Sequence, residues 1–228
     1  MSEQQPAPFH DPQPVAAYAQ GPARNVPGWA DMLRMADLLL AERAPDDGTI
    51  LVVGAGGGLE LKRFAGAHPA WRFVGVDPSG EMLKLARATL GPLASRADLH
   101  EGYVDSAPAG PFDGATCLLT MHFVAFEERQ RMLEQIRRRL RPKAPLVIAH
   151  LSFPQAADER ETWLQRYAAF VASSGIEPAK ARAGAQAVGS KLPVLSPEQD
   201  EALLREAGFS NPQLFYAGFA FRGWVSYA

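Results

Sequence analysis

The sequence is poor in cysteine and has no long apolar run. Its 228 residues include a single cysteine, Cys117, so no disulfide can form within one chain. This excludes the disulfide-braced scaffolds of small secreted proteins. No apolar stretch is long enough to span a bilayer, and the N-terminus lacks a basic region followed by an apolar one. We therefore expect a cytoplasmic protein that does not enter a membrane.

The sequence also lacks a strong excess of charge. The formal net charge is −2, so no bulk electrostatic field would draw the protein to nucleic acid. No spacing of cysteine and histidine is typical of a metal site. Apolar residues make up 47% of the chain, whose length suits one sizeable domain. We expect a globular domain without a metal that acts on a small molecule, either as a monomer or as a homodimer.

From residue 49 onward, short apolar runs alternate with helical patterns. We expect strands at residues 49–53, 71–77, 97–104, 112–119 and 144–151. This alternation predicts an α/β fold, with a parallel sheet and helices on both faces. Right-handed crossovers then bring the carboxyl ends of the strands to one edge, where ligands bind. Two final strands, 212–219 and 221–227, are separated by almost no loop and require an antiparallel pairing.

Two segments depart from this alternation, and they give the chain its expected organisation. Residues 1–48 contain a short helical stretch at 15–20 and an amphipathic helix from Trp29, and we expect this segment to cover the ligand site. Residues 49–228 form the main domain, in which residues 154–193 read as a helical lid over the crevice. The lid aromatics Trp163, Tyr167 and Phe170 either line an acceptor pocket or pack between helices.

The strongest motif is the glycine cluster that follows the first strand. Gly54, Gly56 and Gly58 allow the polar groups of a ligand to approach the backbone, at the start of a helix with free N–H groups. A glycine cluster can also be a plain turn. Leu59 stands where a dinucleotide-binding fingerprint needs a third glycine, so the spacing does not favour NAD.

Asp77 ends the second strand, nineteen positions after Gly58. A carboxylate at this place can accept hydrogen bonds from both hydroxyls of a ribose. The sequence Asp77-Pro78-Ser79 also suits a helix cap, and both roles can hold together. The two motifs together predict a site for an adenosine with a zwitterionic, methionine-like part.

Five segments in register resemble class I S-adenosylmethionine (SAM)-dependent methyltransferases. They read VVGAGGGLE, FVGVDPSGEMLKLA, HEGYVDSAP, FDGATCLLTMHFV and LLREAGFSNPQLFYAGFAFRGWVSYA. The likeness covers residues 49–151 and 196–228. It implies a Rossmann-like, seven-stranded, mostly parallel sheet with an antiparallel last strand inserted beside the fifth. It also implies SAM as cofactor and S-adenosylhomocysteine (SAH) as product.

The resemblance implies a set of cofactor-binding residues at the carboxyl edge. They are Gly54, Ala55, Gly56, Gly58, Asp77, Pro78, Met82, Val104, Asp105, Leu119 and Thr120. The glycines would hold the methionine part, Asp77 the ribose, and Met82 would pack near the adenine. Tyr103 occupies a position where many members carry an adenine-reading Asp, which leaves that role to Asp105 or to the backbone of Val104. Leu119 and Thr120 would close the site. Apart from the resemblance, Tyr18 on the helical stretch at 15–20 either closes over SAM or is a surface residue of an amphipathic helix.

A narrower likeness concerns the N-terminal segment. The stretch ARNVPGWADMLRMADLLLAER is similar to the start of carboxy-SAM synthases, which transfer a carboxyl unit from prephenate onto SAM. Those enzymes need a basic residue for the extra carboxylate, and Arg24 and Arg182 are the candidates. A carboxy-SAM synthase-like activity and a catalytically silent SAM-binding module therefore stay as alternatives to methyl transfer.

Two histidines fall at the carboxyl edge, where a general base would stand. His122 follows the fourth strand and His150 ends the fifth. Either could take a proton from an acceptor hydroxyl or amine, and either could be a structural polar group. Methyl transfer needs mainly the alignment of two reactants, so a catalytic side chain is not required. The acceptor and the reacting atom do not follow from the sequence.

Overall fold

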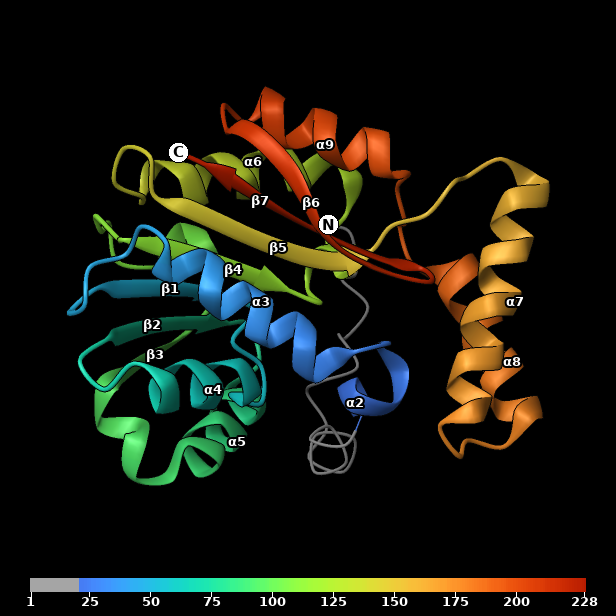
Figure 1. The fold of residues 1–228 in the computed structure, drawn as a ribbon, viewed down its shortest axis with the longest axis horizontal. Coiled ribbons are helices and arrows are strands. Elements are labelled where there is room, and N and C mark those ends of the chain that lie inside the picture. The colour runs from blue at the N-terminus through green and yellow to red at the C-terminus, as the bar shows by residue number, and fades with distance from the viewer. Residues whose placement is uncertain (1–20) are drawn as a thin grey trace, which may run out of the picture.

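In the computed structural model, which describes residues 21–228, seven strands form one sheet (Figure 1). They are β1 (Thr49–Val53), β2 (Arg72–Asp77), β3 (Ala97–Glu101), β4 (Gly114–Leu118), β5 (Pro145–Leu151), β6 (Ser210–Gly218) and β7 (Phe221–Tyr227). The strand order is β3-β2-β1-β4-β5-β7-β6. The first five strands pair in parallel, and β7 runs antiparallel between β5 and β6. The expected sheet and its antiparallel last strand are confirmed.

Helices cover both faces of this sheet. One face carries α3 (Trp29–Ala41), α4 (Leu59–Ala67) and α5 (Gly80–Leu90), and the other carries α6 (Phe126–Arg138) and α9 (Pro197–Glu206). β4 and β5 are buried from end to end, and β1 from Ile50 onward, because both faces of these central strands are covered. This arrangement leaves the carboxyl edge of the parallel strands as the place where the connecting loops gather.

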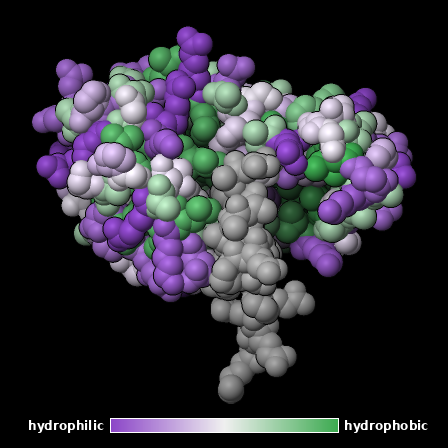
Figure 2. Space-filling view, turned by 90° about the horizontal axis from the view of Figure 1, so that it is seen from below, coloured by the Kyte–Doolittle hydropathy of each residue, from purple (hydrophilic) through white to green (hydrophobic). Residues whose placement is uncertain are grey.

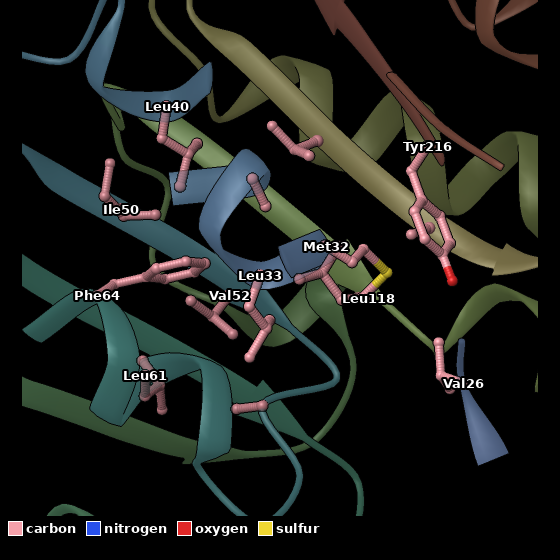
Figure 3. Packing of buried hydrophobic residues seen from close by; sticks show 14 of the residues in the cluster. Val26, Met32, Leu33, Leu40, Ile50, Val52, Leu61, Phe64, Leu118 and Tyr216 are labelled. Atoms are coloured by element: carbon pink, nitrogen blue, oxygen red, sulfur yellow. The ribbon is translucent and has the colours of Figure 1, made fainter. Parts of the chain in front are cut away.

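The core beneath α3 joins segments that are far apart in the sequence (Figure 3). Met32 and Leu40 of α3 meet Val52 of β1 and Phe64 of α4, and each of these side chains is fully buried. Tyr216 of β6 lies at the far end of the same cluster, where its hydroxyl donates to the carbonyl oxygen of Pro27. Residues 26–41 are thereby fixed across one face of the sheet.

The predicted lid consists of two antiparallel helices, α7 (Ala157–Ser173) and α8 (Pro178–Lys191). We call this pair the α7–α8 arm. It stands apart from the main body at one end of the sheet, beyond α2 (Gly21–Asn25) (Figure 1). Apolar side chains gather on the flank of the arm that is turned toward the body (Figure 2). The covering role of this segment stays a prediction.

Several strand ends differ from the expected ones. The predicted strand 97–104 ends at Glu101, because Gly102 has a φ of 143° and the chain turns into the 3-10 helix η3 (Val104–Ser106). Phe112 makes only an isolated bridge to Leu140 before β4 begins. The helix expected at 15–20 lies outside the described residues. None of the helices within residues 21–228 has the length and apolar character of a membrane span.

Candidate functional site

The glycine loop joins β1 to α4 at the carboxyl edge of the sheet. The backbone φ angles of Gly54, Gly56 and Gly58 are 74°, 46° and 77°. Residues other than glycine rarely adopt such values. The N–H groups of Gly54 and Ala55 donate to the carbonyl oxygen of Val76 at 2.8 and 3.0 Å. The loop is therefore held against the end of β2 before any ligand arrives.

Two of the three glycines are also required by packing within the protein. A Cβ atom on Gly54 would lie 2.0 Å from Oγ1 of Thr120, and one on Gly58 would lie 2.8 Å from Cα of Ala86. Gly58 thus permits the close approach of α4 to α5. The packing requirement for glycine at these positions is compatible with the predicted binding of a ligand by the same loop.

Asp77 links the glycine loop to the start of α5. Its Oδ2 accepts a hydrogen bond from the backbone N–H of Gly56 at 2.9 Å, and its Oδ1 accepts one from the N–H of Ser79 at 2.9 Å. The cap of α5 is Ser79, whose side chain accepts from the N–H of Met82 at 3.2 Å. Asp77 therefore orients the cap and the loop, and its carboxylate lies where they meet.

Glu60 is a buried carboxyl group of the site that the sequence reasoning missed. It lies in the first turn of α4, and its Oε1 accepts a hydrogen bond from Oγ1 of Thr116 on β4 at 2.7 Å. Burial raises the pKa of Glu60 to about 8, and the bond from Thr116 offsets this only in part. At neutral pH this carboxyl is mostly protonated. The sequence feature that could have indicated a buried carboxyl is a glutamate flanked by leucines directly after the glycine loop.

The loop after β3 lies on the side expected to hold the adenine. Met82 and Val104 are buried, whereas the Tyr103 side chain is 66% exposed. The Asp105 carboxylate pairs with Arg131 of α6, and the Asp105 carbonyl oxygen accepts from Arg139. Pro78 is half-buried beside Asp77. The Asp105 carboxylate is thus already paired, and the group that would read a base stays a prediction.

The end of β4 closes the other side of the glycine loop. Leu119 leaves the strand with a φ of 56°, a left-handed conformation that is uncommon for leucine. Its N–H donates to the carbonyl oxygen of Ala149 at 2.6 Å, and Thr120 Oγ1 donates to that of Leu118 at 3.1 Å. Leu118 and Leu119 line a small cavity together with Gly54, and the contact of Leu119 with a cofactor stays a prediction.

His122 lies in the 3-10 helix η4 (Met121–Phe123) after β4 and is buried. The N–H of Leu151 donates to its Nδ1 at 3.4 Å. Burial, together with the nearby His150 and Arg129, holds the pKa of His122 well below its ordinary value. A neutral ring that accepts at Nδ1 carries its proton on Nε2. His122 is thus arranged as a hydrogen-bond donor, and its catalytic role stays a prediction.

His150 lies on β5, and its side chain is fully enclosed. Its Nε2 is 3.2 Å from Oδ1 of Asp200, and its ring packs against Trp224. Asp200 is also 3.8 Å from Nη1 of the buried Arg129. These contacts join β5 to α6 and α9. The contacts of His150 are therefore those of a structural polar group, and its role as a base stays a prediction.

An aromatic and cationic cluster lies between the α7–α8 arm and the β6–β7 turn. The guanidinium groups of Arg166 and Arg222 lie 4.6 and 5.0 Å from the ring centre of Trp163. Tyr167 packs edge-on against Phe221, with ring centres 5.9 Å apart. Phe170 of the arm meets Phe219, which is 45% exposed. The predicted lid aromatics thus pack between the arm and the β6–β7 turn, on the side of the arm that is turned toward the body.

Other candidates add little to the site. Tyr18 lies outside the described residues. Within residues 21–228, no group of three acidic, histidine or cysteine side chains is placed to hold a metal. Cys117 is buried, and burial raises its pKa to about 12, so its thiol is protonated at neutral pH. What gathers at the edge is backbone polar groups and the carboxyls of Asp77 and Glu60, a set that suits a ligand with hydroxyl and ammonium groups.

Comparisons with known proteins agree with this geometry. Residues 50–143 match the model of a family described as a methyltransferase domain. Carboxy-S-adenosyl-L-methionine synthase of Wolinella succinogenes is 25% identical over 210 residues, which cover 90% of this chain and 85% of that protein. The protein of the same name from Campylobacter jejuni is 23% identical over 209 residues, covering 90% and 87%.

Solved structures show the same fold at lower identity. An O-methyltransferase family protein from Burkholderia thailandensis superimposes with a TM-score of 0.68 at 15% identity, over 100% of this chain and 63% of that one. Human N-acetylserotonin methyltransferase, solved in complex with SAM, gives a TM-score of 0.64 at 17% identity, over 96% and 57%. The chain thus spans less than two thirds of these structures.

Proposed function

This chain is a class I SAM-dependent methyltransferase, and from that premise we propose that it methylates a small-molecule acceptor at the carboxyl edge of its sheet. The observation that carries the proposal is the Asp77 carboxylate, which is held 2.9 Å from the N–H of Gly56. The glycine loop and the β2 end meet there, in the arrangement that an adenosine with a methionine part requires. The residues present therefore fit the cofactor.

In this proposal the protein works by alignment. SAM supplies a methyl group on a sulfonium, which an acceptor atom takes by direct displacement. The glycine loop would hold the methionine part, Asp77 would hold the ribose, and the backbone at Val104 would meet the adenine. Positioning of two reactants supplies about 7–11 kcal/mol in favourable cases, so no strong base is needed. The arm, with Trp163 and Tyr167, would select the acceptor.

The cofactor part is tested by thermal unfolding with SAM, SAH or NAD. A ligand at a hundred times its dissociation constant adds about 2.7 kcal/mol of stability. We expect SAM and SAH to raise the melting temperature and NAD to leave it unchanged. Release of SAH with a screened acceptor would then exclude a silent binding module. Stabilisation by NAD alone, or by none of the three, would contradict the proposal.

The Asp77 variant sharpens this test. Asp77→Asn keeps one acceptor oxygen but turns an amide toward one of two backbone N–H groups, so we expect SAH affinity to fall about tenfold or more. Asp113→Asn is the matched control, because Asp113 Oδ2 accepts from the N–H of Thr49 at 2.9 Å at the opposite end of β1. We expect Asp113→Asn to affect stability without affecting SAH affinity. Equal losses of affinity in both variants would remove Asp77 from the site.

A carboxy-SAM synthase-like activity is the second candidate. It is supported by the curated relatives of that name, which align over about 90% of the chain. An extra carboxylate would need a cation, and the candidates Arg24 and Arg182 both have exposed side chains, on α2 and α8. Mass spectrometry of the nucleoside that co-purifies with the protein separates the two candidates. Carboxy-SAM in that fraction would favour the synthase, and SAM or SAH would favour methyl transfer.

A cytoplasmic location and a homodimer belong to the same proposal. The presence of one buried cysteine, Cys117, is consistent with a reducing compartment. Cell fractionation tests the location. Light scattering of the purified chain tests the oligomeric state.

A further inference from the structure

One carboxyl group lines the small cavity at the glycine loop. Glu60 is among the residues that line this cavity, together with Gly54, Gly58, Trp29 and Leu119. The other side chains in the lining are apolar. Among residues 21–228, Glu60 is therefore the ionisable residue that lines this cavity.

Within the described residues, Glu60 has one hydrogen-bond partner, Thr116, and no cationic partner. On β4, the titratable group that interacts electrostatically with Glu60 is the Cys117 thiol, which is protonated and uncharged at neutral pH. Arg63 of α4 forms an ion pair with Asp37 of α3. The Asp77 carboxylate at the end of β2 accepts hydrogen bonds from the N–H groups of Gly56 and Ser79. The Glu60 carboxyl is thus desolvated without a compensating charge.

We propose that Glu60 receives the α-ammonium group of the cofactor's methionine part, and that cofactor binding releases one proton from the Glu60 carboxyl to solvent. The inference rests on the proposed function. A cation brought within about 4–6 Å favours the ionised carboxyl. The N-terminal turn of α4, in which Glu60 lies, also favours a negative charge. The ammonium keeps its own proton, so the balance is one carboxyl proton lost for each cofactor bound.

The pH range of this release follows from the free protein. Because burial raises the pKa of Glu60 to about 8, the carboxyl is protonated below that pH and has a proton to lose. The number of protons released is expected to be close to one at pH 6.5. It should decrease as the pH rises through 8, where Glu60 is already ionised before the ligand binds.

Isothermal titration calorimetry tests the proposal. At pH 7, SAH is titrated in two buffers that differ in ionisation enthalpy, which gives the number of protons released. 5′-Methylthioadenosine serves as the second ligand, because it has the adenosine and the thioether but no ammonium group. The proteins are the unmodified chain, Glu60→Gln, and the control Glu128→Gln, whose side chain is exposed on α6.

Glu60→Gln should fold normally at this pH, because glutamine has the shape of a protonated glutamate and keeps an acceptor for Thr116. We expect it to bind SAH about ten- to hundredfold more weakly, as for the loss of a charged hydrogen bond, and to release no proton. Its affinity for 5′-methylthioadenosine should match that of the unmodified chain. Glu128→Gln should behave as the unmodified chain with both ligands.

Three results would overturn the inference. They are equal weakening of both ligands by Glu60→Gln, binding of SAH to the unmodified chain without proton release, and an affinity of Glu60→Gln for SAH equal to that of the unmodified chain. Failure of the proposed function looks different, because the unmodified chain would then bind neither SAH nor 5′-methylthioadenosine, and the inference would fall with it.

Discussion

At the scale of single residues, Glu60 makes the stability of the fold depend on pH. Its pKa is about 8 in the folded chain against an ordinary 4.5, so between these values the folded state holds a proton that the unfolded state has lost. The stabilisation is complete below pH 4.5, decreases as the pH rises, and is gone above 8. The slope approaches about 1.4 kcal/mol per pH unit. Urea unfolding at pH 5.5, 7 and 8.5 should show this loss.

The same series with Glu60→Gln should be flatter, because the amide does not ionise. Glu128→Gln should follow the unmodified chain. If the unmodified chain and Glu60→Gln lost stability in parallel over this range, Glu60 would not be the group responsible.

The sequence predicts some of these residues well and others not at all. Gly56 and Asp77 could be placed together because each ends or follows a strand of a parallel sheet, and all such ends share one edge. Glu60 could not be found in this way, since its partner Thr116 is 56 positions away and its burial depends on how α4 lies on the sheet. The pairing of Asp105 with Arg131 is equally a property of the folded chain.

At the scale of elements, the contact between α4 and α5 depends on Gly58. Gly58→Ala would place a Cβ 2.8 Å from Cα of Ala86 and would keep a φ of 77° that alanine resists. We expect a loss of about 2–4 kcal/mol, combining backbone strain with displacement of a helix. Gly66→Ala is the control, because a Cβ at this position of the same helix meets no atom within 4 Å.

Gly66→Ala should leave stability unchanged or raise it by up to about 1 kcal/mol, because alanine favours a helix over glycine. Chemical unfolding of the two variants measures the difference. If both substitutions had similar effects, the approach of α4 to α5 would not be what requires Gly58.

Another element-scale prediction concerns the buried pair that joins α6 to α9. Arg129 is fully enclosed, its Nε donates to the carbonyl oxygen of Val124 at 3.0 Å, and its Nη1 lies 3.8 Å from Asp200. Arg129→Met would leave Asp200 buried with only His150 nearby, so we expect a loss of about 3–5 kcal/mol. The double variant with Asp200→Leu should recover part of it. Additive losses in an unfolding cycle would show that the pair is not coupled.

The elements themselves were predicted where the pattern is local. β1 and β5 were expected because each is rich in apolar, β-favouring residues; β5 is buried throughout, and β1 is buried except at Thr49. β3 was expected to reach Val104, yet it ends at Glu101, because its apolar pattern is weak and Gly102 turns the chain. The lid was expected as helical patches, but its pairing into two antiparallel helices depends on contacts between α7 and α8 that periodicity does not show.

At the scale of the whole molecule, the sheet and the α7–α8 arm should differ in local stability. The sheet is covered on both faces, whereas the arm contacts the body through α2, Leu164 and the aromatic pairs that Tyr167 and Phe170 form with the β6–β7 turn. Elements with few buried contacts open more readily than a core strand. Hydrogen exchange followed by mass spectrometry should therefore show faster exchange in residues 157–191 than in β1, β4 and β5.

Ligands should then act on separate parts of the molecule. SAH is expected to slow exchange in residues 54–60 and 77–82, which the hydrogen bonds of Asp77 already join, while residues 157–191 stay unchanged. An acceptor bound beneath the arm should slow exchange in residues 157–191 as well, because it would close Trp163 and Tyr167 over the edge. An arm as protected as β5 in the free protein, or protected by SAH alone, would mean that this segment is a fixed wall of the cofactor site, and acceptor selection would have to be sought elsewhere.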